Sequence, residues 1–173
     1  MIKVKRYGNP LRLLIAVSAM LLWIGCTDRN LPTTNPVQPM DVKQFQAIVT
    51  DTDFSGLAVV FASWCRPCRR ELPELTEVYH AFSSKGIRVI SVSVDDGDTS
   101  KVQSLVNRLQ LPYPVYHVGT ALVPEYRLVG VPTLLVFHKG KVVENSPGQQ
   151  SAQSLTEKVM RLMAIPQSVP VQK

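Results

Sequence analysis

The sequence is poor in cysteine and histidine, with three of each among 173 residues, and it lacks a long apolar run. No run reaches the roughly 18–20 residues of a membrane-spanning helix, which excludes a polytopic membrane protein. His80, His117 and His138 are scattered, so the four ligands of a structural metal site are not predicted. The length fits one domain of ordinary size.

Positive charge is concentrated at the amino terminus. The formal net charge is +6, yet Lys3, Lys5, Arg6 and Arg12 lie in residues 1–25, which contain no acid. Without that segment the charge is +2 (+6 minus +4). A nearly balanced remainder does not support a nucleic-acid partner.

The first 25 residues have the pattern of a secretory signal. The charged start is followed by Leu13–Gly25 (LLIAVSAMLLWIG), an apolar core of 13 residues that ends on a small residue before Cys26. Thirteen helical residues rise only about 20 Å, against about 30 Å of hydrocarbon in a bilayer. We therefore predict a signal peptide over residues 1–25.

Cys26 is the candidate first residue of the mature chain. Ile24-Gly25-Cys26 resembles a bacterial lipobox, which implies lipid on Cys26 and an anchor in the cell envelope, on the periplasmic side of a membrane. An uncleaved signal-anchor, or secretion with Cys26 as a spare thiol, are the alternatives. With lipid on Cys26, Cys65 and Cys68 remain as one pair in a compartment that permits disulfides.

The remaining chain divides into a tether, a domain and a tail. Residues 26–39 include three prolines and many small polar residues, which predicts an extended, lipid-anchored tether. Residues 40–164 form the predicted domain. Residues 165–173 contain two prolines and are predicted to be a flexible tail.

Alternating strands and helices predict an α/β fold with a central mixed sheet covered by helices on both faces. A continuous apolar run at 57–62 indicates a buried strand, and 87–94 (IRVISVSV) is predicted to be a second one. Expected helices cover 41–50, 66–84, 99–109 and 151–163, a hairpin joins 133–138 to 141–144, residues 111–116 are an extended connection, and 95–98 are a solvated acidic loop.

The chemistry lies in Trp64-Cys65-Arg66-Pro67-Cys68, where the first strand becomes a helix. Unpaired N–H groups and the helix dipole favour a thiolate at Cys65, and a thiolate is the nucleophile of disulfide exchange. Cys68 lies one turn further along the helix, within reach of a small disulfide ring. One alternative is half of a zinc site, but the sequence offers no second pair of ligands for the metal. The other is a purely structural disulfide, but so small a loop would constrain the unfolded chain little.

Residues 57–73 resemble the thioredoxin superfamily, with an apolar strand, Trp-Cys-x-x-Cys and a helix that contains Pro73. Val131-Pro132-Thr133 resembles that superfamily's cis-proline loop. The resemblance implies that Pro132 packs beside Cys65 and that the Val131 backbone pairs with a substrate strand; an ordinary trans proline at the start of a strand is the alternative. Trp64 is predicted to be a partly exposed lid over the disulfide.

Residues 40–163 are most similar to the TlpA-like branch of exported thiol–disulfide oxidoreductases, through Cys68-Arg69-Arg70-Glu71-Leu72-Pro73. The resemblance implies that Glu71 accepts a proton from Cys68. A solvated acid at the helix start is the alternative. Val59 stands where related thioredoxins bury an aspartate, which makes Glu71 the better candidate for this role.

The predicted function is reduction of disulfides in exported proteins, including apocytochromes c, by a membrane-tethered enzyme with a redox-active Cys65–Cys68 disulfide and no other cofactor. A membrane protein with a thiol pair is the expected electron donor. A disulfide oxidase or isomerase of the same fold is one alternative, and a copper-delivery module that holds Cu(I) on the two cysteines is another.

Overall fold

The computed structural model of the protein describes residues 35–165. Predictions for the signal peptide at 1–25, for lipid on Cys26 and for residues 26–34 and 166–173 lie outside the described part of the chain. In chain order the elements are β1 (Gln38–Pro39), α2 (Val42–Val49), β2 (Gly56–Phe61), α3 (Arg66–Phe82), the 3-10 turn η1 (Ser83–Lys85), β3 (Arg88–Ser93), α4 (Ser100–Leu109), β4 (Val115–His117), α5 (Leu122–Glu125), β5 (Thr133–His138), β6 (Lys141–Pro147) and α6 (Ala152–Ala164).

The strands form one mixed sheet in the order β1-β4-β3-β2-β5-β6. The β1–β4, β4–β3 and β3–β2 pairs are parallel, whereas β2–β5 and β5–β6 are antiparallel. Every residue of β2 is buried, as expected for a strand between two covered faces. The chain leaves β2 at the carboxyl edge of the parallel strands, where α3 begins.

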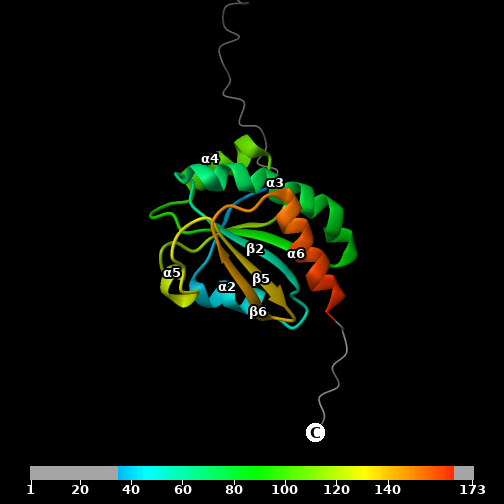
Figure 1. Cartoon of the computed structure of the whole chain (residues 1–173). Helices are drawn as coiled ribbons and strands as arrows, with labels where there is room; N and C mark the ends of the chain where they lie inside the picture. Colours follow the sequence, from blue (N-terminus) through cyan, green and yellow to red (C-terminus); the bar gives the residue numbers. More distant parts are fainter. Residues whose placement is uncertain (1–34, 166–173) are drawn as a thin grey trace, which may run out of the picture. The chain divides into compact units, whose positions relative to one another are not determined.

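Helices cover both faces of the sheet, which confirms the predicted fold class. Helices α3 and α6 pack against each other (Figure 1), and Val136 of β5 faces a small cavity that α6 also lines. The next residue, Phe137, points to the opposite face. There its ring contacts Phe54 and Tyr126, and Tyr126 in turn packs on Phe45 of α2.

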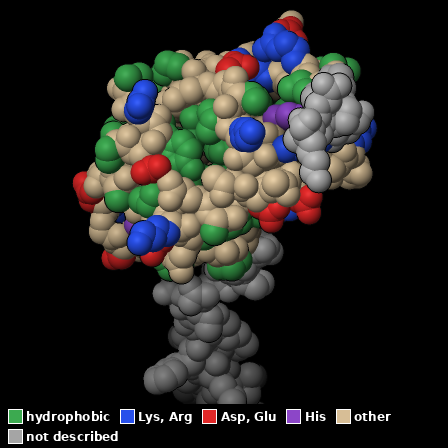
Figure 2. Space-filling model, turned by 90° about the horizontal axis from the view of Figure 1, so that it is seen from below, with side chains coloured by type: hydrophobic (Ala, Val, Ile, Leu, Met, Phe, Trp, Pro, Cys, Tyr) green, Lys and Arg blue, Asp and Glu red, His purple; other side chains and the backbone are tan. Residues whose placement is uncertain are grey.

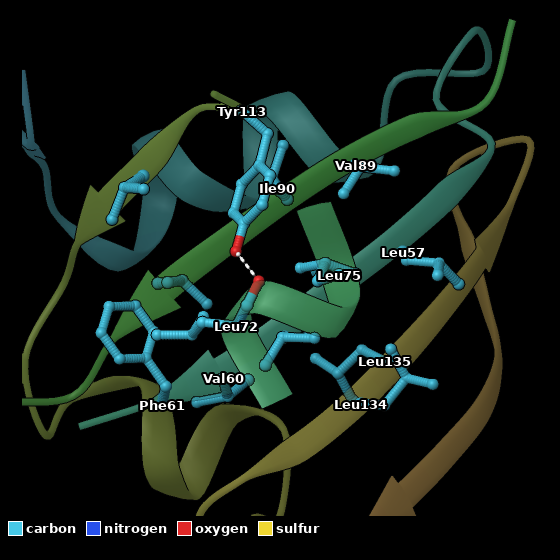
Figure 3. Packing of buried hydrophobic residues seen from close by; sticks show 14 of the residues in the cluster. Leu57, Val60, Phe61, Leu72, Leu75, Val89, Ile90, Tyr113, Leu134 and Leu135 are labelled. Atoms are coloured by element: carbon cyan, nitrogen blue, oxygen red, sulfur yellow. Dashed lines mark hydrogen bonds between the residues drawn. The ribbon is translucent and has the colours of Figure 1, made fainter. Parts of the chain in front are cut away.

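The apolar side of α3 forms part of the hydrophobic core on one face of the sheet. Leu72 and Leu75 are fully buried, and Figure 3 shows them lying over the strands. Burial of each such side chain contributes about 1.5–3 kcal/mol. The hydroxyl of the buried Tyr113 donates a hydrogen bond to the Leu72 carbonyl at 2.9 Å, which ties the segment before β4 to the helix that carries the cysteines.

The predicted boundary between tether and domain at residue 40 is wrong, because residues 35–39 belong to the folded body. The Asn35 amide donates to the carbonyls of Leu111 and Tyr113, at 2.8 and 2.6 Å. Val37 is buried, and the two residues after it pair with β4. The proline signal was misleading because β1 is an edge strand, where a missing N–H is tolerated.

Short elements differ from the sequence prediction. The connection at 111–116 runs into the three-residue strand β4, and the stretch before Pro132 contains the four-residue helix α5. Neither is long enough to show a hydrophobic period. Asp95 is buried, with 4% exposure, although its stretch was expected to be a solvated loop.

The surface gives no sign of a single dominant charge on the face drawn in Figure 2, where basic, acidic and apolar side chains are interspersed. Within residues 35–165, no helix combines the length and apolar character that crossing a membrane requires.

Candidate active site

The two cysteines lie at the junction of β2 and α3. The Cys65 N–H donates to the Ala62 carbonyl at 3.1 Å, which closes a tight turn after the strand. Cys65 is the N-cap of α3, and its Sγ accepts a hydrogen bond from the Cys68 N–H at 3.2 Å. Pro67 occupies the first turn, where its missing N–H leaves no bond unmade. Sulfur therefore takes the place that a capping oxygen has in other helices.

Cys65 and Cys68 form a disulfide with a Cα–Cα distance of 5.3 Å. Both residues are buried, but Cys65 keeps 4% exposure whereas Cys68 has none. A disulfide is attacked at the sulfur that a partner can reach. This small exposure, together with the place of Cys65 at the N-cap beside Val131, favours Cys65 as the sulfur that meets a partner and Cys68 as the inner one.

The Val131–Pro132 peptide bond is cis, as the family resemblance implied. The Val131 carbonyl oxygen lies 3.5 Å from Cys65 Sγ. In the disulfide form Sγ carries no hydrogen, so this is a contact; once reduced, the thiol has a hydrogen to donate there. The carbonyl of the buried Pro132 accepts a hydrogen bond from the Gly148 N–H at 2.8 Å. This bond links the cis-proline loop to the segment before α6.

Trp64 projects into solvent beside the disulfide, with 70% exposure. Its ring and the cis-proline loop border a cavity of about 360 Å³. Apolar side chains from three segments contribute to its lining: Trp64, Val94, Val123, Leu128, Val129 and Val131. An exposed aromatic ring next to a reactive sulfur is suited to contact with another polypeptide.

Glu71 is fully buried on the same face of α3 as Cys68, one turn along. Its Oε2 accepts a hydrogen bond from the Gln150 N–H at 3.1 Å, whereas Oε1 has no protein partner. Burial raises the pKa of Glu71 to about 7, and the Gln150 bond opposes that rise. This carboxyl can thus exchange a proton near neutral pH, and it is not the solvated acid that was the alternative reading of its position.

Positive side chains surround the start of α3. Arg66 and Arg69 are exposed, and Arg70 donates two hydrogen bonds to the Gln149 side chain. No acidic residue occupies the first turn of this helix. The charges favour a thiolate at Cys65, in the same direction as the helix dipole.

A second buried acid, Asp95, was missed as a residue of this site. Its carboxylate accepts hydrogen bonds from the Ser63 N–H at 2.8 Å and the Ser63 hydroxyl at 2.5 Å. Asp95 meets Ser63 because each lies two residues beyond the end of its strand, where Phe61 pairs with Ser93. That register is not readable from one sequence.

The described residues bring together most of the predicted site: Trp64, Cys65, Cys68, Glu71, Val131 and Pro132. Cys26 lies outside them. Across residues 35–165, no group of three or more histidine, cysteine, aspartate or glutamate side chains is arranged to hold a metal ion.

Comparison with known proteins finds relatives that are named thiol-disulfide oxidoreductases. The chain is 30% identical over 115 residues to thiol-disulfide oxidoreductase ResA of Bacillus thuringiensis, which covers 64% of this chain and 66% of that protein. It is 27% identical over 101 residues to sporulation thiol-disulfide oxidoreductase A of Bacillus subtilis, with 56% and 61% covered. The chain thus matches about two thirds or less of the length of these two relatives.

Solved structures support the fold. The thioredoxin domain of a thiol-disulfide oxidoreductase from Bacteroides vulgatus superposes with a TM-score of 0.57 at 21% identity, covering 64% of this chain and 79% of that one. A DsbF homologue from Corynebacterium diphtheriae gives 0.56 at 25% identity, with 64% and 73% covered. These matches confirm the thioredoxin-like fold.

The family assignment rests on residues 35–146, which match the model of the AhpC/TSA family. That range exceeds half of the chain and includes Cys65, Cys68 and the cis-proline loop. The chain therefore belongs to the AhpC/TSA family.

Proposed function

We propose that this protein is an exported thiol–disulfide oxidoreductase that reduces disulfides in other exported proteins. The observation that carries the proposal is the Cys65–Cys68 disulfide at the N-terminus of α3, with Cys65 placed beside the cis-proline loop. Cys65 keeps 4% exposure and lies against the Val131 carbonyl, and Cys68 is fully buried one turn further along α3. The relatives named thiol-disulfide oxidoreductases support this chemistry.

The reaction begins with the reduced dithiol. The Cys65 thiolate attacks one sulfur of a partner disulfide, a Cys65–partner disulfide forms, and the partner's other sulfur leaves as a thiolate and takes a proton. Cys68 then attacks Cys65 Sγ, the internal disulfide forms, and the partner leaves as its second thiol. Two electrons pass to the partner in this sequence, and a dithiol donor at the membrane restores the reduced pair.

Glu71 is the proposed proton acceptor for Cys68. A thiol must lose its proton before it attacks, and Cys68 is shielded from water. Glu71 is on the same helix face, and its free Oε1 leaves one acceptor position open. A carboxyl with a pKa of about 7 can take up and release this proton at neutral pH.

The proposed substrate contacts are the backbone of Val131, the adjoining Pro132 and the ring of Trp64. An extended segment of the partner would lie along the cis-proline loop while its cysteine meets Cys65. The exposure of Trp64 and its place at the cavity edge support this arrangement.

The proposed location is the periplasmic side of a membrane, with lipid on Cys26 as the anchor. The charged start, the short apolar core and the lipobox-like residues before Cys26 support it. In this setting, apocytochromes c are proposed substrates of the reductase, and a membrane protein with a thiol pair is the proposed donor.

Reduction of insulin by dithiothreitol, with and without the protein, tests the activity. We expect Cys65→Ser to abolish the acceleration. Cys26→Ser is the matched control, because it removes the cysteine outside the pair and should leave the acceleration intact. Equal turnover in the wild type and Cys65→Ser would refute the proposal.

The measured reduction potential decides the direction of electron flow. A value near about −270 mV, as in thioredoxin, agrees with a reductase, whereas a value near about −120 mV, as in DsbA, would make the protein a disulfide donor.

A further inference from the structure

A buried cluster of one acid, Asp95, and two serines, Ser63 and Ser93, lies where β2 and β3 end. Asp95 has 4% exposure, and its carboxylate receives three hydrogen bonds. Two come from the N–H and hydroxyl of Ser63, and the third comes from the Ser93 hydroxyl at 2.6 Å. Ser93 Oγ in turn accepts from the Asp95 N–H at 3.0 Å. A buried carboxylate is tolerated when donors surround it in this way.

The sheet side of this cluster is held independently of the cysteines. Ser93 is the last residue of β3 and is fully buried. His117 of β4 lies beside it, with Nε2 at 3.0 Å from the Gly97 carbonyl. Because a carbonyl can only accept, Nε2 carries a hydrogen in this contact. Asp95 is therefore fixed to the sheet from one side and binds Ser63 on the other.

Ser63 connects the cluster to the reactive sulfur. It lies between the end of β2 and the N-cap Cys65, two residues from that cysteine. The segment 62–64 carries Trp64 and aims Cys65 Sγ at the Cys68 N–H. Two bonds to Ser63 thus fix the backbone that sets this capping geometry.

We infer that Asp95 is a positioning residue of the active site, which acts through Ser63 to hold Cys65 at the N-terminus of α3. This inference builds on the proposed function, in which Cys65 is the attacking thiolate. A thiolate gains from the helix N-terminus only while its sulfur stays within the first turn, since the dipole effect falls off over that distance.

Loss of the Ser63 hydroxyl removes one of the two bonds between Asp95 and the segment before Cys65. The sulfur is then held less well at the helix start, so a smaller fraction of Cys65 is ionised at neutral pH. Loss of a donor to the Asp95 carboxylate is common to any variant that removes one of its hydroxyl partners, so a second variant of that kind isolates the effect of positioning.

Ser63→Ala in the full chain, reduced and in detergent, tests the inference, with Ser93→Ala as the matched control. Both variants remove one hydroxyl donor from Asp95, but only Ser63→Ala loosens the segment that carries Cys65. The readout is the iodoacetamide rate of Cys65, located by peptide fragmentation, at neutral pH divided by its rate where the thiol is fully ionised. The ratio cancels changes in access, and thermal unfolding shows that each variant is folded.

We expect Ser63→Ala to lower the ratio by roughly three- to tenfold, the equivalent of one hydrogen bond, and Ser93→Ala to keep it within about twofold. An unchanged or higher ratio in Ser63→Ala, or a similar fall in both variants, would overturn the positioning role. The assay needs no partner protein, so its result is separate from failure of the proposed reductase activity.

Discussion

The buried carboxyl of Glu71 is connected to the segment before α6 by a hydrogen bond from the Gln150 N–H, at 3.1 Å. That same segment donates the Gly148 N–H to the Pro132 carbonyl. The three residues 148–150 therefore contact both the inner side of the cysteine helix and the cis-proline loop. It places a carboxyl with a raised pKa behind Cys68 and a fixed backbone edge in front of Cys65.

Replacement of Glu71 by glutamine should change how stability depends on pH. Burial raises the pKa of Glu71 from 4.5 to about 7. As pH rises between these values, the unfolded chain loses this proton before the folded protein does, so the wild type loses stability. Urea unfolding of the oxidised protein should show Glu71→Gln gaining about 3 kcal/mol relative to wild type between about pH 5 and pH 8.

Glu74→Gln is the control for that experiment. Glu74 lies on the same helix, is partly exposed, and accepts a hydrogen bond from the Ala152 N–H at 2.9 Å. A parallel pH profile for Glu71→Gln and the wild type would contradict the raised pKa of Glu71, whatever constant offset the amide adds.

Removal of the Trp64 ring should weaken the reaction with proteins selectively. An exposed aromatic side chain at a contact surface contributes on the order of 1–2 kcal/mol to association, so Trp64→Ala should lower kcat/KM for insulin about tenfold. Exchange with glutathione disulfide should change by less than about twofold, because so small a substrate does not need that surface. Stability should also be little changed, since the ring is 70% exposed.

Met160→Ala is the matched control for Trp64. Met160 is another exposed apolar side chain, at 56%, but it lies on α6. Equal losses with insulin and with glutathione disulfide in Trp64→Ala would contradict a substrate-binding role for the ring.

Loss of the Tyr113 hydroxyl should destabilise the cysteine helix. The hydroxyl donates to the Leu72 carbonyl inside the core, so Tyr113→Phe should cost about 1 kcal/mol in the free energy of unfolding. Tyr79→Phe serves for comparison, because its ring packs near Tyr113 with centroids 6.0 Å apart. If the unfolding midpoint of Tyr113→Phe in urea equals that of the wild type, the bond does not contribute to stability.

Much of the fold was predictable because its long elements carry clear patterns. Helices were predicted over 41–50 and 151–163; in the structure Asp41 begins α2 with a capping box to Gln44, and Ser151 caps α6. The hairpin around Lys139-Gly140 is also present. The edge strand β1 and the short strand β4 were missed, because two or three residues show no period and their pairing depends on tertiary contacts.

The candidate site was likewise only partly predictable from the sequence. The cysteine pair follows from a local motif, and the cis bond before Pro132 follows from the family resemblance of Val131-Pro132-Thr133. Asp95 could not be separated from its acidic neighbours, because burial of one acid in a polar run depends on the strand register. The lack of a partner for Glu71 Oε1 is likewise a property of packing.

Trapping of the covalent intermediate tests the central claim most directly. The Cys68→Ser variant, reduced and mixed with a disulfide-containing protein, cannot resolve the bond that Cys65 forms. Mass spectrometry with peptide fragmentation should find the partner attached to Cys65, and Cys65→Ser should accumulate no such adduct at Cys68 under the same conditions. An absence of adduct at Cys65 in the folded protein, or preferential attachment at Cys68, would contradict the account.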